Sequence, residues 1–368
     1  MRVLILTFLG LWLLASAGSV EAQTSFVDVP GAEFEPQPER DEALGFSNGS
    51  FIAVPIPSKD PTFGAGLALL GGYLFKADEE SANSIIGLGA YGTSNGSRAY
   101  GFAANVAFDE NRWKATIFGG EVDLLYDLFV LGVPVPLNQK GELAALKLSY
   151  GFTPDFSVGV GLRYLSTSIA PDLGFSLPPE ISEDLRTRIG SVGLLANWDR
   201  RDDTFYPTVG TNVSFDAYQH VVEGGSREYQ KSVLKLDGFH PITDQILLAG
   251  RVAACAASED APFFDSCSLG GVDGFRGFSV TENIGTRLAS LQASLRGRIG
   301  ERFGYEVFAG AGAVENTALS QNSNETRYAA GLGVRYRLTK KFPLDFALDG
   351  TLNDAGEEIV YIRIGQAF

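Results

Sequence analysis

The residues best placed for chemistry lie in one glycine-rich stretch. Residues 270–278 read GGVDGFRGF, which sets a single cation, Arg276, between Phe275 and Phe278 among four glycines. Glycine lets the backbone bend where other residues would be strained. A flexible loop that presents one arginine favours a specific role for that arginine. A plain glycine-rich turn with a solvated arginine is the alternative.

Three other features suggest enzyme chemistry, and each has a simpler interpretation. Residues 92–96 match the Gly-x-Ser-x-Gly nucleophile pattern, which requires a strand, a sharp turn and a helix. Here Ser94 lies between two alternating segments, where a hairpin turn is expected. His220 could serve as a base for a serine, but it stands at the edge of a loop. Asp199 and Asp202 favour a salt-bridged turn, so we expect neither an enzyme nor a cofactor.

The N-terminus predicts export. Arg2 precedes an apolar run over residues 3–17, and Val20-Glu21-Ala22 places small residues where a signal peptidase would cut, which predicts a signal peptide over 1–22. The apolar run is shorter than the roughly 20 residues of a membrane-spanning helix. Residues 23–46 carry six acids and one base, so we expect a disordered acidic linker. A net charge of −15 argues against nucleic acid as a partner.

The two cysteines, Cys255 and Cys267, stand twelve positions apart. Disulfides persist in exported proteins, so we expect them to be bridged, with free thiols as the alternative. The chain-entropy contribution of so small a loop is about 3 kcal/mol. No neighbouring Cys or His completes a zinc ligand set, so no metal site is expected.

Alternating hydrophobicity runs through the rest of the chain. Val209, Val213 and Phe215 share one face of their segment, and polar residues share the other. Segments of about ten residues with this period are typical of tilted strands that cross a membrane. The pattern predicts sixteen strands over 63–76, 85–94, 98–108, 112–119, 121–131, 143–152, 156–168, 188–199, 209–219, 229–240, 245–255, 285–299, 304–314, 327–338, 344–351 and 358–368. We therefore expect an all-β fold, a 16-stranded antiparallel transmembrane β-barrel formed by a domain over 47–368.

Several motifs resemble one family. GGVDGFRGF is similar to the lumen-plugging loop of the outer-membrane insertase and transporter superfamily, also called the bacterial surface antigen family. Residues 199–202 with 205–210 resemble its strand and periplasmic-turn signature, and residues 60–64 resemble a weaker copy. The last eight residues, YIRIGQAF, are similar to the C-terminal signal for barrel assembly.

The resemblance covers about residues 63–368 and implies an extracellular loop inserted into the lumen of an outer-membrane barrel. The loop motif comprises Gly270, Gly271, Phe275, Arg276, Gly277 and Phe278, and the assembly signal comprises Tyr361, Ile364 and Phe368. The implied partners are outer-membrane lipid and, for the protein's own insertion, the barrel assembly machinery of a Gram-negative bacterium.

The chain departs from the family pattern in two ways. In the family the loop arginine meets lumen-facing acids, but the matching positions here are Gln292 and Gly310. A buried charge without a partner costs several kcal/mol, so another acid is expected to compensate. The candidates that share the lumen-facing parity are Asp199, Asp216 and Glu306. The family's periplasmic polypeptide-binding (POTRA) repeats are also expected to be absent, which puts the capture of unfolded clients in doubt and suggests a periplasmic partner in trans.

Three functions are consistent with these observations. The first is insertion or translocation of protein or lipid at the outer membrane, with lateral opening between the first and last strands. The second is a passive outer-membrane channel, which predicts an open bore. The third is a structural or lipid-interacting barrel without transport.

Overall fold

The computed structural model describes residues 50–78, 81, 84–172, 186–203, 206–224, 227–243, 245–271, 273–315, 326–337 and 345–368. The expected signal peptide and acidic linker lie outside these residues. Antiparallel strands close into one barrel in the order β1-β18-β17-β16-β15-β14-β11-β10-β9-β8-β7-β6-β5-β4-β3-β2. The predicted 16-stranded barrel is therefore confirmed. Among the described residues, no helix has the length and hydrophobicity needed to cross a membrane.

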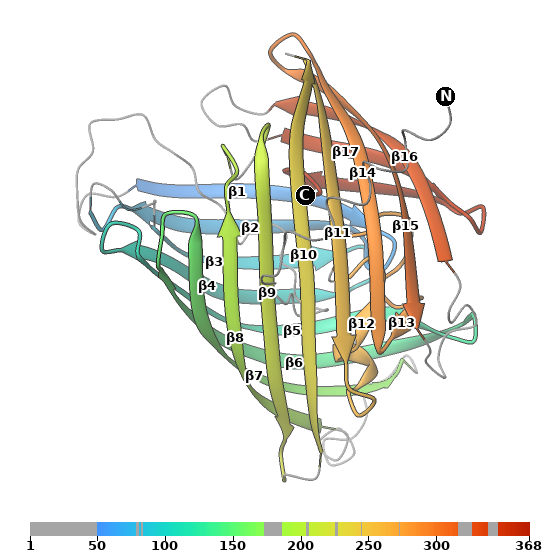
Figure 1. Cartoon of the computed structure of the whole chain (residues 1–368). Coiled ribbons are helices and arrows are strands. Elements are labelled where there is room, and N and C mark those ends of the chain that lie inside the picture. Colours follow the sequence, from blue (N-terminus) through green and yellow to red (C-terminus); the bar gives the residue numbers. More distant parts are fainter. Residues whose placement is uncertain are drawn as a thin grey trace, which may run out of the picture.

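The wall strands are, in chain order, β1 (Ser50–Asp60), β2 (Gly64–Phe75), β3 (Ser84–Thr93), β4 (Arg98–Phe108), β5 (Trp113–Val130), β6 (Val133–Gly151), β7 (Phe156–Pro171), β8 (Arg186–Asp199), β9 (Gly210–Val222), β10 (Glu228–Thr243), β11 (Ile246–Ala257), β14 (Arg287–Ile299), β15 (Phe303–Glu315), β16 (Thr326–Arg337), β17 (Asp345–Asn353) and β18 (Glu358–Ile364). Figure 1 shows β1 to β6 in one wall and β8 to β14 in the opposite wall. Large apolar side chains such as Leu88, Leu194 and Leu332 point outward, and each is more than 60% exposed. Such an outer surface is suited to lipid.

The first strand, β1, was not predicted. Its sequence SFIAVPIPSKD contains Pro55 and Pro57, and prolines argue against a central strand. In the barrel β1 pairs with β2 along its whole length, but it registers with β18 only at Lys59 and Ile362. Pro55 and Pro57 are two positions apart in the strand, so the two N–H donors that they lack would both point to the same side of β1. Because the ladder to β2 is continuous, that side is the one that faces β18.

The predicted count of sixteen was right because a second error offset the first. Segments 112–119 and 121–131 form one strand, β5, which runs through Gly119 and Gly120 without a turn. A Cβ at Gly119 would lie 2.6 Å from the ring of Phe102 on β4. The glycine therefore makes room for a cross-strand aromatic ring, which a chain-local pattern does not reveal.

The last strand is shorter than predicted. It ends at Ile364, and Gly365 adopts a φ of 91°, which turns the chain out of the strand. Phe368 is buried against Phe239 and Leu247 of the opposite wall. Strand alternation over 358–368 would place Phe368 on the same face as Val360 and Ile362, but the turn at Gly365 removes it from that face.

The turn at residues 60–64 lies at the same end of the barrel as the long loop after β11. Thr62 Oγ1 is 3.0 Å from Ser279 Oγ of that loop. Its likeness to a periplasmic turn is thus not borne out, because it sits at the extracellular end.

Candidate functional site

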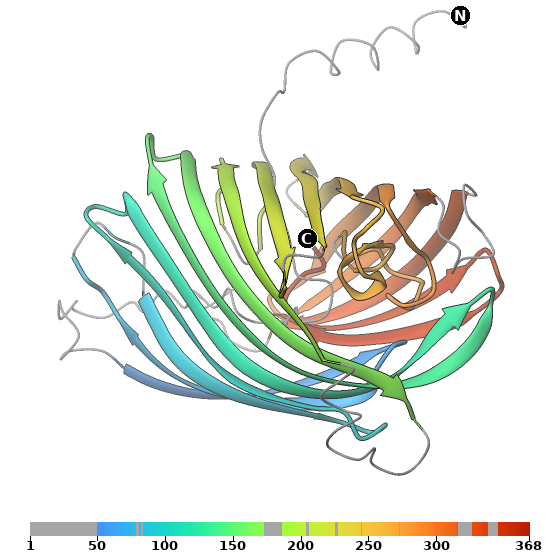
Figure 2. The same cartoon turned by 90° about the horizontal axis from the view of Figure 1, so that it is seen from below.

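The long connection between β11 and β14 folds into the barrel lumen. It contains a short 3-10 turn, η2 (Phe263–Asp265), and the paired segments β12 (Cys267–Ser268) and β13 (Ile284–Gly285). Figure 2 shows this orange segment lying inside the ring of strands. Cys255 of β11 and Cys267 form a disulfide with their Cα atoms 5.8 Å apart, which confirms the predicted bridge. The disulfide ties the start of the loop to the wall.

Arg276 projects from the loop into the wall formed by β15, β16 and β17. Its Nη2 donates to Glu306 Oε1 at 2.9 Å and its Nη1 donates to Asp349 Oδ2 at 3.1 Å. The guanidinium carbon lies 3.3 Å from the centroid of the Phe308 ring. The Arg276 side chain is 3% exposed and both carboxylates are fully buried. A guanidinium that meets two carboxylates and a ring face forms a strong, oriented contact.

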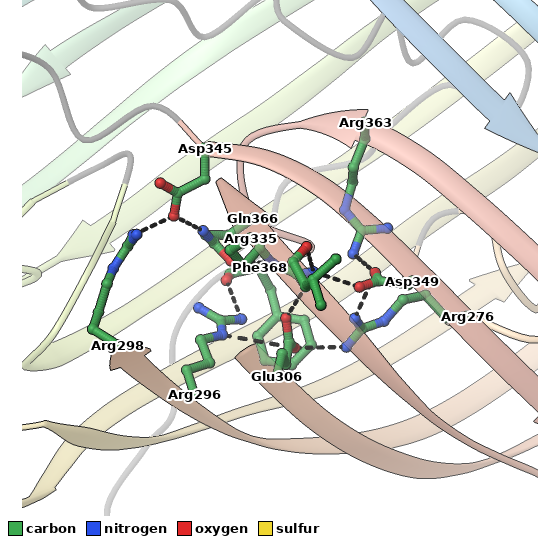
Figure 3. Close-up of polar contacts among 11 residues, drawn as sticks. Arg276, Arg296, Arg298, Glu306, Arg335, Asp345, Asp349, Arg363, Gln366 and Phe368 are labelled. Atoms are coloured by element: carbon green, nitrogen blue, oxygen red, sulfur yellow. Dashed lines mark hydrogen bonds and ion pairs between the residues drawn. The ribbon is translucent and has the colours of Figure 1, made fainter. Parts of the chain in front are cut away.

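The two acids are shared with three further arginines from neighbouring strands (Figure 3). Arg335 of β16 bonds to both acids, at 2.5 Å to Asp349 Oδ1, and Arg363 of β18 also bonds to Asp349. Arg296 Nε of β14 lies 3.7 Å from Glu306 Oε1. This cluster therefore links the loop to every wall strand from β14 to β18. Two carboxylates facing four guanidiniums give the cluster an excess of positive charge.

Gly277 lets the loop approach the wall closely. A Cβ there would lie 2.5 Å from Ala329 Cβ, and its φ of 122° disfavours other residues. Its N–H donates to Tyr361 Oη at 2.7 Å, and its carbonyl accepts from Asn353 Nδ2 at 2.9 Å. Phe275 and Phe278 are buried in an apolar cluster with the disulfide. The loop motif is thus held by both polar and apolar contacts.

The three candidate acids for Arg276 have different partners in the structure. Of the three, Glu306 contacts Arg276, whereas Asp199 pairs with Arg201 at 2.6 Å and Asp216 pairs with Lys147 at 3.5 Å. The other candidate lumen partner, Gln292, donates to the carbonyl of Asp273 in the loop at 3.2 Å.

The second acid partner, Asp349, was missed by the sequence reasoning. Alternation within the predicted strand 344–351 would have identified it, because Asp345, Ala347 and Asp349 share the buried face. Gly310 cannot carry the acid of the family pattern, since a Cβ there would lie 2.7 Å from the Phe275 ring.

A second ionic cluster, also missed, holds the loop to the other side of the barrel. Asp265 accepts hydrogen bonds from Arg163 of β7, from Tyr229 Oη at 2.7 Å and from Lys231 Nζ at 3.3 Å. Burial raises the pKa of Asp265, but Arg163 and Lys231 outweigh it and hold that pKa well below its usual range. The loop is therefore anchored to β7 and β10 as well as to β14–β18.

The possible catalytic features have structural explanations. Ser94 lies in the turn between β3 and β4, where its Oγ accepts from Ala65 N at 3.2 Å. The Oγ of Ser191 lies 2.7 Å from His220 Nδ1, and Asp265 lies 3.8 Å from that same nitrogen. A relay of serine, histidine and acid needs the two partners on opposite ring nitrogens. This arrangement does not provide one.

A closed barrel whose lumen holds an arginine-pinned loop defines a class of outer-membrane β-barrel proteins. A model of the Omp85 superfamily domain matches residues 85–368. The chain belongs to this superfamily, and its location is the outer membrane of a Gram-negative bacterium.

Solved structures support the fold. BamA from Haemophilus ducreyi lacking POTRA domains 1-3 is 14% identical, with a TM-score of 0.61 over 86% of this chain and 70% of that one. CdiB from Acinetobacter baumannii is 13% identical, with a TM-score of 0.61 over 86% of this chain and 59% of that one. CdiB from Escherichia coli is 15% identical, with a TM-score of 0.57 over 86% and 62% of the two chains. A comparison with curated proteins gave no match.

Proposed function

We propose that this barrel inserts or translocates protein or lipid at the outer membrane by opening laterally between β1 and β18. The observation that carries the proposal is the single registered pair in that seam, Lys59 with Ile362. By contrast, β17 and β18 register from Phe346 through Leu352. Few hydrogen bonds must break for the seam to open, so separating these two strands costs less than separating any fully registered pair.

The pinned loop supports a gated rather than an open barrel. Arg276 and Asp265 hold the loop against opposite sides of the lumen, 3.1 Å from Asp349 and 2.7 Å from Tyr229 respectively. A passive channel needs a continuous water-filled bore, so the loop argues against that alternative. The loop also braces β14–β18 on one side of the seam, and it contacts the turn after β1, where Thr62 Oγ1 lies 3.0 Å from Ser279 Oγ.

A disulfide across the seam tests the proposal. Lys59→Cys with Ile362→Cys places two cysteines at the registered pair, and Leu69→Cys with Ala90→Cys places two at a registered pair of β2 and β3 as the matched control. Both variants are reconstituted in vesicles, and the folding of an unfolded barrel client and the exchange of labelled lipid between leaflets are measured. Oxidation should abolish activity in the seam variant alone, and reductant should restore it. Equal activity in the oxidised seam and control variants would refute lateral opening.

The proposal also concerns partners. Outer-membrane lipid surrounds the barrel, and the barrel assembly machinery is proposed to insert it through a signal that includes Tyr361, Ile364 and Phe368. A periplasmic partner that binds clients in trans would be recovered with the protein from outer-membrane extract; recovery of the barrel alone would count against that partner.

A further inference from the structure

The lumen face of β2 to β6 contains a trough whose floor is made of glycine residues. One row of cross-strand partners reads Leu70, Gly89, Gly101, Gly120 and Leu143 from β2 to β6. Three adjacent glycines thus form the floor, and a leucine stands at each side. The remaining hollow has a volume of about 130 Å³.

The lining of the trough is apolar. Its lumen-facing side chains include Val54, Leu70, Ile85, Phe118, Val122 and Leu143. Among the residues that line the hollow, the polar side chain on the lumen face is Tyr91, whose hydroxyl lies 3.1 Å from Ser58 Oγ. The lining residues Tyr100 and Glu121 point outward and bond to each other. An occupant that needs hydrogen bonds would therefore lose them in this trough.

Curvature explains only part of the glycine row. A Cβ at Gly101 would lie 2.5 Å from the Gly119 carbonyl oxygen, and a Cβ at Gly120 would lie 2.8 Å from that of Tyr100, so the bend of the wall requires these two glycines. At Gly89 the close contact, at 2.6 Å, is the tip of the flexible Leu70 side chain. The small residues Ala99 and Ala103 extend the floor above and below the row. Larger apolar residues at Gly89, Ala99 and Ala103 would fill the hollow.

The two ends of the trough differ. The extracellular end is closed by an apolar cluster in which Ile284 of the loop packs on Leu124 and Tyr126. The lining of the opposite end stops at Ala103 and Phe118. Beyond it, the paired residues Asn105 and Thr116 lead to Lys114, four residues from Phe118 on β5, a rise of about 13 Å. Lys114 is exposed and has no ion-pair partner within the described part of the chain. A cation beyond the open end of an apolar trough matches an anionic headgroup that is followed by a hydrocarbon chain.

We propose that this trough binds one acyl chain of an anionic phospholipid, with its phosphate near Lys114 at the periplasmic mouth. The outer faces of the same strands already contact lipid, through side chains such as Leu88 and Phe102. The site goes beyond the proposed function, because binding requires neither separation of β1 from β18 nor release of the loop.

Photolabelling tests the proposal. The mature chain is reconstituted in phosphatidylglycerol vesicles that contain phosphatidylglycerol with a diazirine at the end of one acyl chain, and labelled residues are mapped by mass spectrometry. The outward residues Leu88 and Phe102 report ordinary lipid contact. The expected result is additional labelling of lumen-facing Val122 and Ala99, near the closed end of the trough.

Substitutions distinguish the trough from the general lipid surface. Ala103→Phe fills the trough and removes room for at least two methylene groups, so lumenal labelling should fall by about tenfold. Ala104→Phe adds the same ring to the outward face of β4 and should leave lumenal labelling unchanged. Lys114→Gln should lower it by about twofold to fivefold. Closure of each barrel is checked by its heat-dependent gel mobility, and Ala103→Leu replaces Ala103→Phe if the latter does not close.

Labelling confined to the outward residues, or equal lumenal labelling in the Ala103 and Ala104 variants, would overturn the proposal. Loss of leaflet exchange in the oxidised seam variant without loss of lumenal labelling would support the two proposals separately.

Discussion

Arg276 Nη1 and Asp349 Oδ2 lie 3.1 Å apart although 73 positions separate the two residues in the chain. The contact joins the tip of the loop to β17, which is separated from the seam by one strand, β18. It exists only because the barrel closes and brings the last strands around the loop. The position of the loop in the lumen and the rigidity of the barrel wall beside the seam therefore depend on the same ion pair.

Arg276→Ala should release the loop tip. It removes the hydrogen bonds of the loop to Glu306 and Asp349, which keep Arg335 as a partner, and each hydrogen bond between charged groups contributes about 1.5–3 kcal/mol. Planar-bilayer recordings of the refolded chain should show a higher conductance. Arg287→Ala removes an exposed pair with Glu315, whose side chains are 70% and 51% exposed, and should change stability by less than about 1 kcal/mol. Equal currents from the native chain and Arg276→Ala would show that this arginine does not control the pore.

Gly310→Asp should destabilise the loop although it restores the acid of the family pattern. The new Cβ would lie 2.7 Å from the Phe275 ring and 2.8 Å from the Leu291 carbonyl oxygen, and overpacking of this kind costs about 1–3 kcal/mol. Thermal unfolding of Gly310→Asp, Phe275→Ala and the double variant measures the coupling. The double variant should lose less than the sum of the single changes. Additive losses would mean that the ring does not exclude the acid.

Pro55→Thr with Pro57→Thr should strengthen the seam. The change returns two N–H donors to the side of β1 that faces β18, and each hydrogen bond contributes about 0.5–1.5 kcal/mol. The pairing of Lys59 with Ile362 places Ile364 opposite Pro57, so hydrogen exchange at Ile364 should slow, and the insertion activity should fall. Ala53→Thr changes an outward residue of β1 that already has its N–H, and it serves as the control. Unchanged hydrogen exchange in the double proline variant would show that the N–H groups missing at Pro55 and Pro57 do not face β18.

Asp265→Asn should detach the loop from β7 and β10. Burial of Asp265 opposes ionisation, but Arg163 and Lys231 lower its pKa in the folded protein. A lowered pKa stabilises the fold above the unfolded value of about 3.9 and ceases to do so as pH falls towards the folded value. The hydrogen-exchange protection factor of the native loop, which is corrected for the intrinsic pH dependence of amide exchange, should therefore stay constant from about pH 8 to 5 and fall only below about pH 4.

The contrasting variant is Asp273→Asn in the same loop. Burial raises the pKa of Asp273, although backbone N–H groups of Gly270 and Phe275 donate to its Oδ1 at 2.8 and 3.2 Å. A raised pKa means that stability falls as pH rises through the unfolded value. The amide keeps the acceptor and removes the charge, so this variant should be as stable as the native chain or more stable at neutral pH. Faster loop exchange in Asp273→Asn than in Asp265→Asn would contradict both assignments.

The sequence by itself determines the two-faced strands and the composition of the loop motif, because each is a local property, and it predicted the disulfide that the structure confirms. Alternation with period two sorts side chains to the two faces of any strand. It predicted β4 at its observed bounds and supplied Glu306 as a lumen-facing acid. It failed at β1, where two prolines are tolerated because they face a weak seam, and at β5, where two glycines make room for neighbouring groups instead of a turn.

Only the tertiary structure decided which groups meet. Asp349 and Asp265 pair with residues 73 and 102 positions away, and their selection depends on the register of every intervening strand. Phe368 likewise leaves β18 for the opposite wall, because a glycine turn and a distant apolar cluster together outweigh the continuing strand pattern. A one-dimensional pattern states which face a residue occupies. Closure of the barrel determines which residue stands across from it.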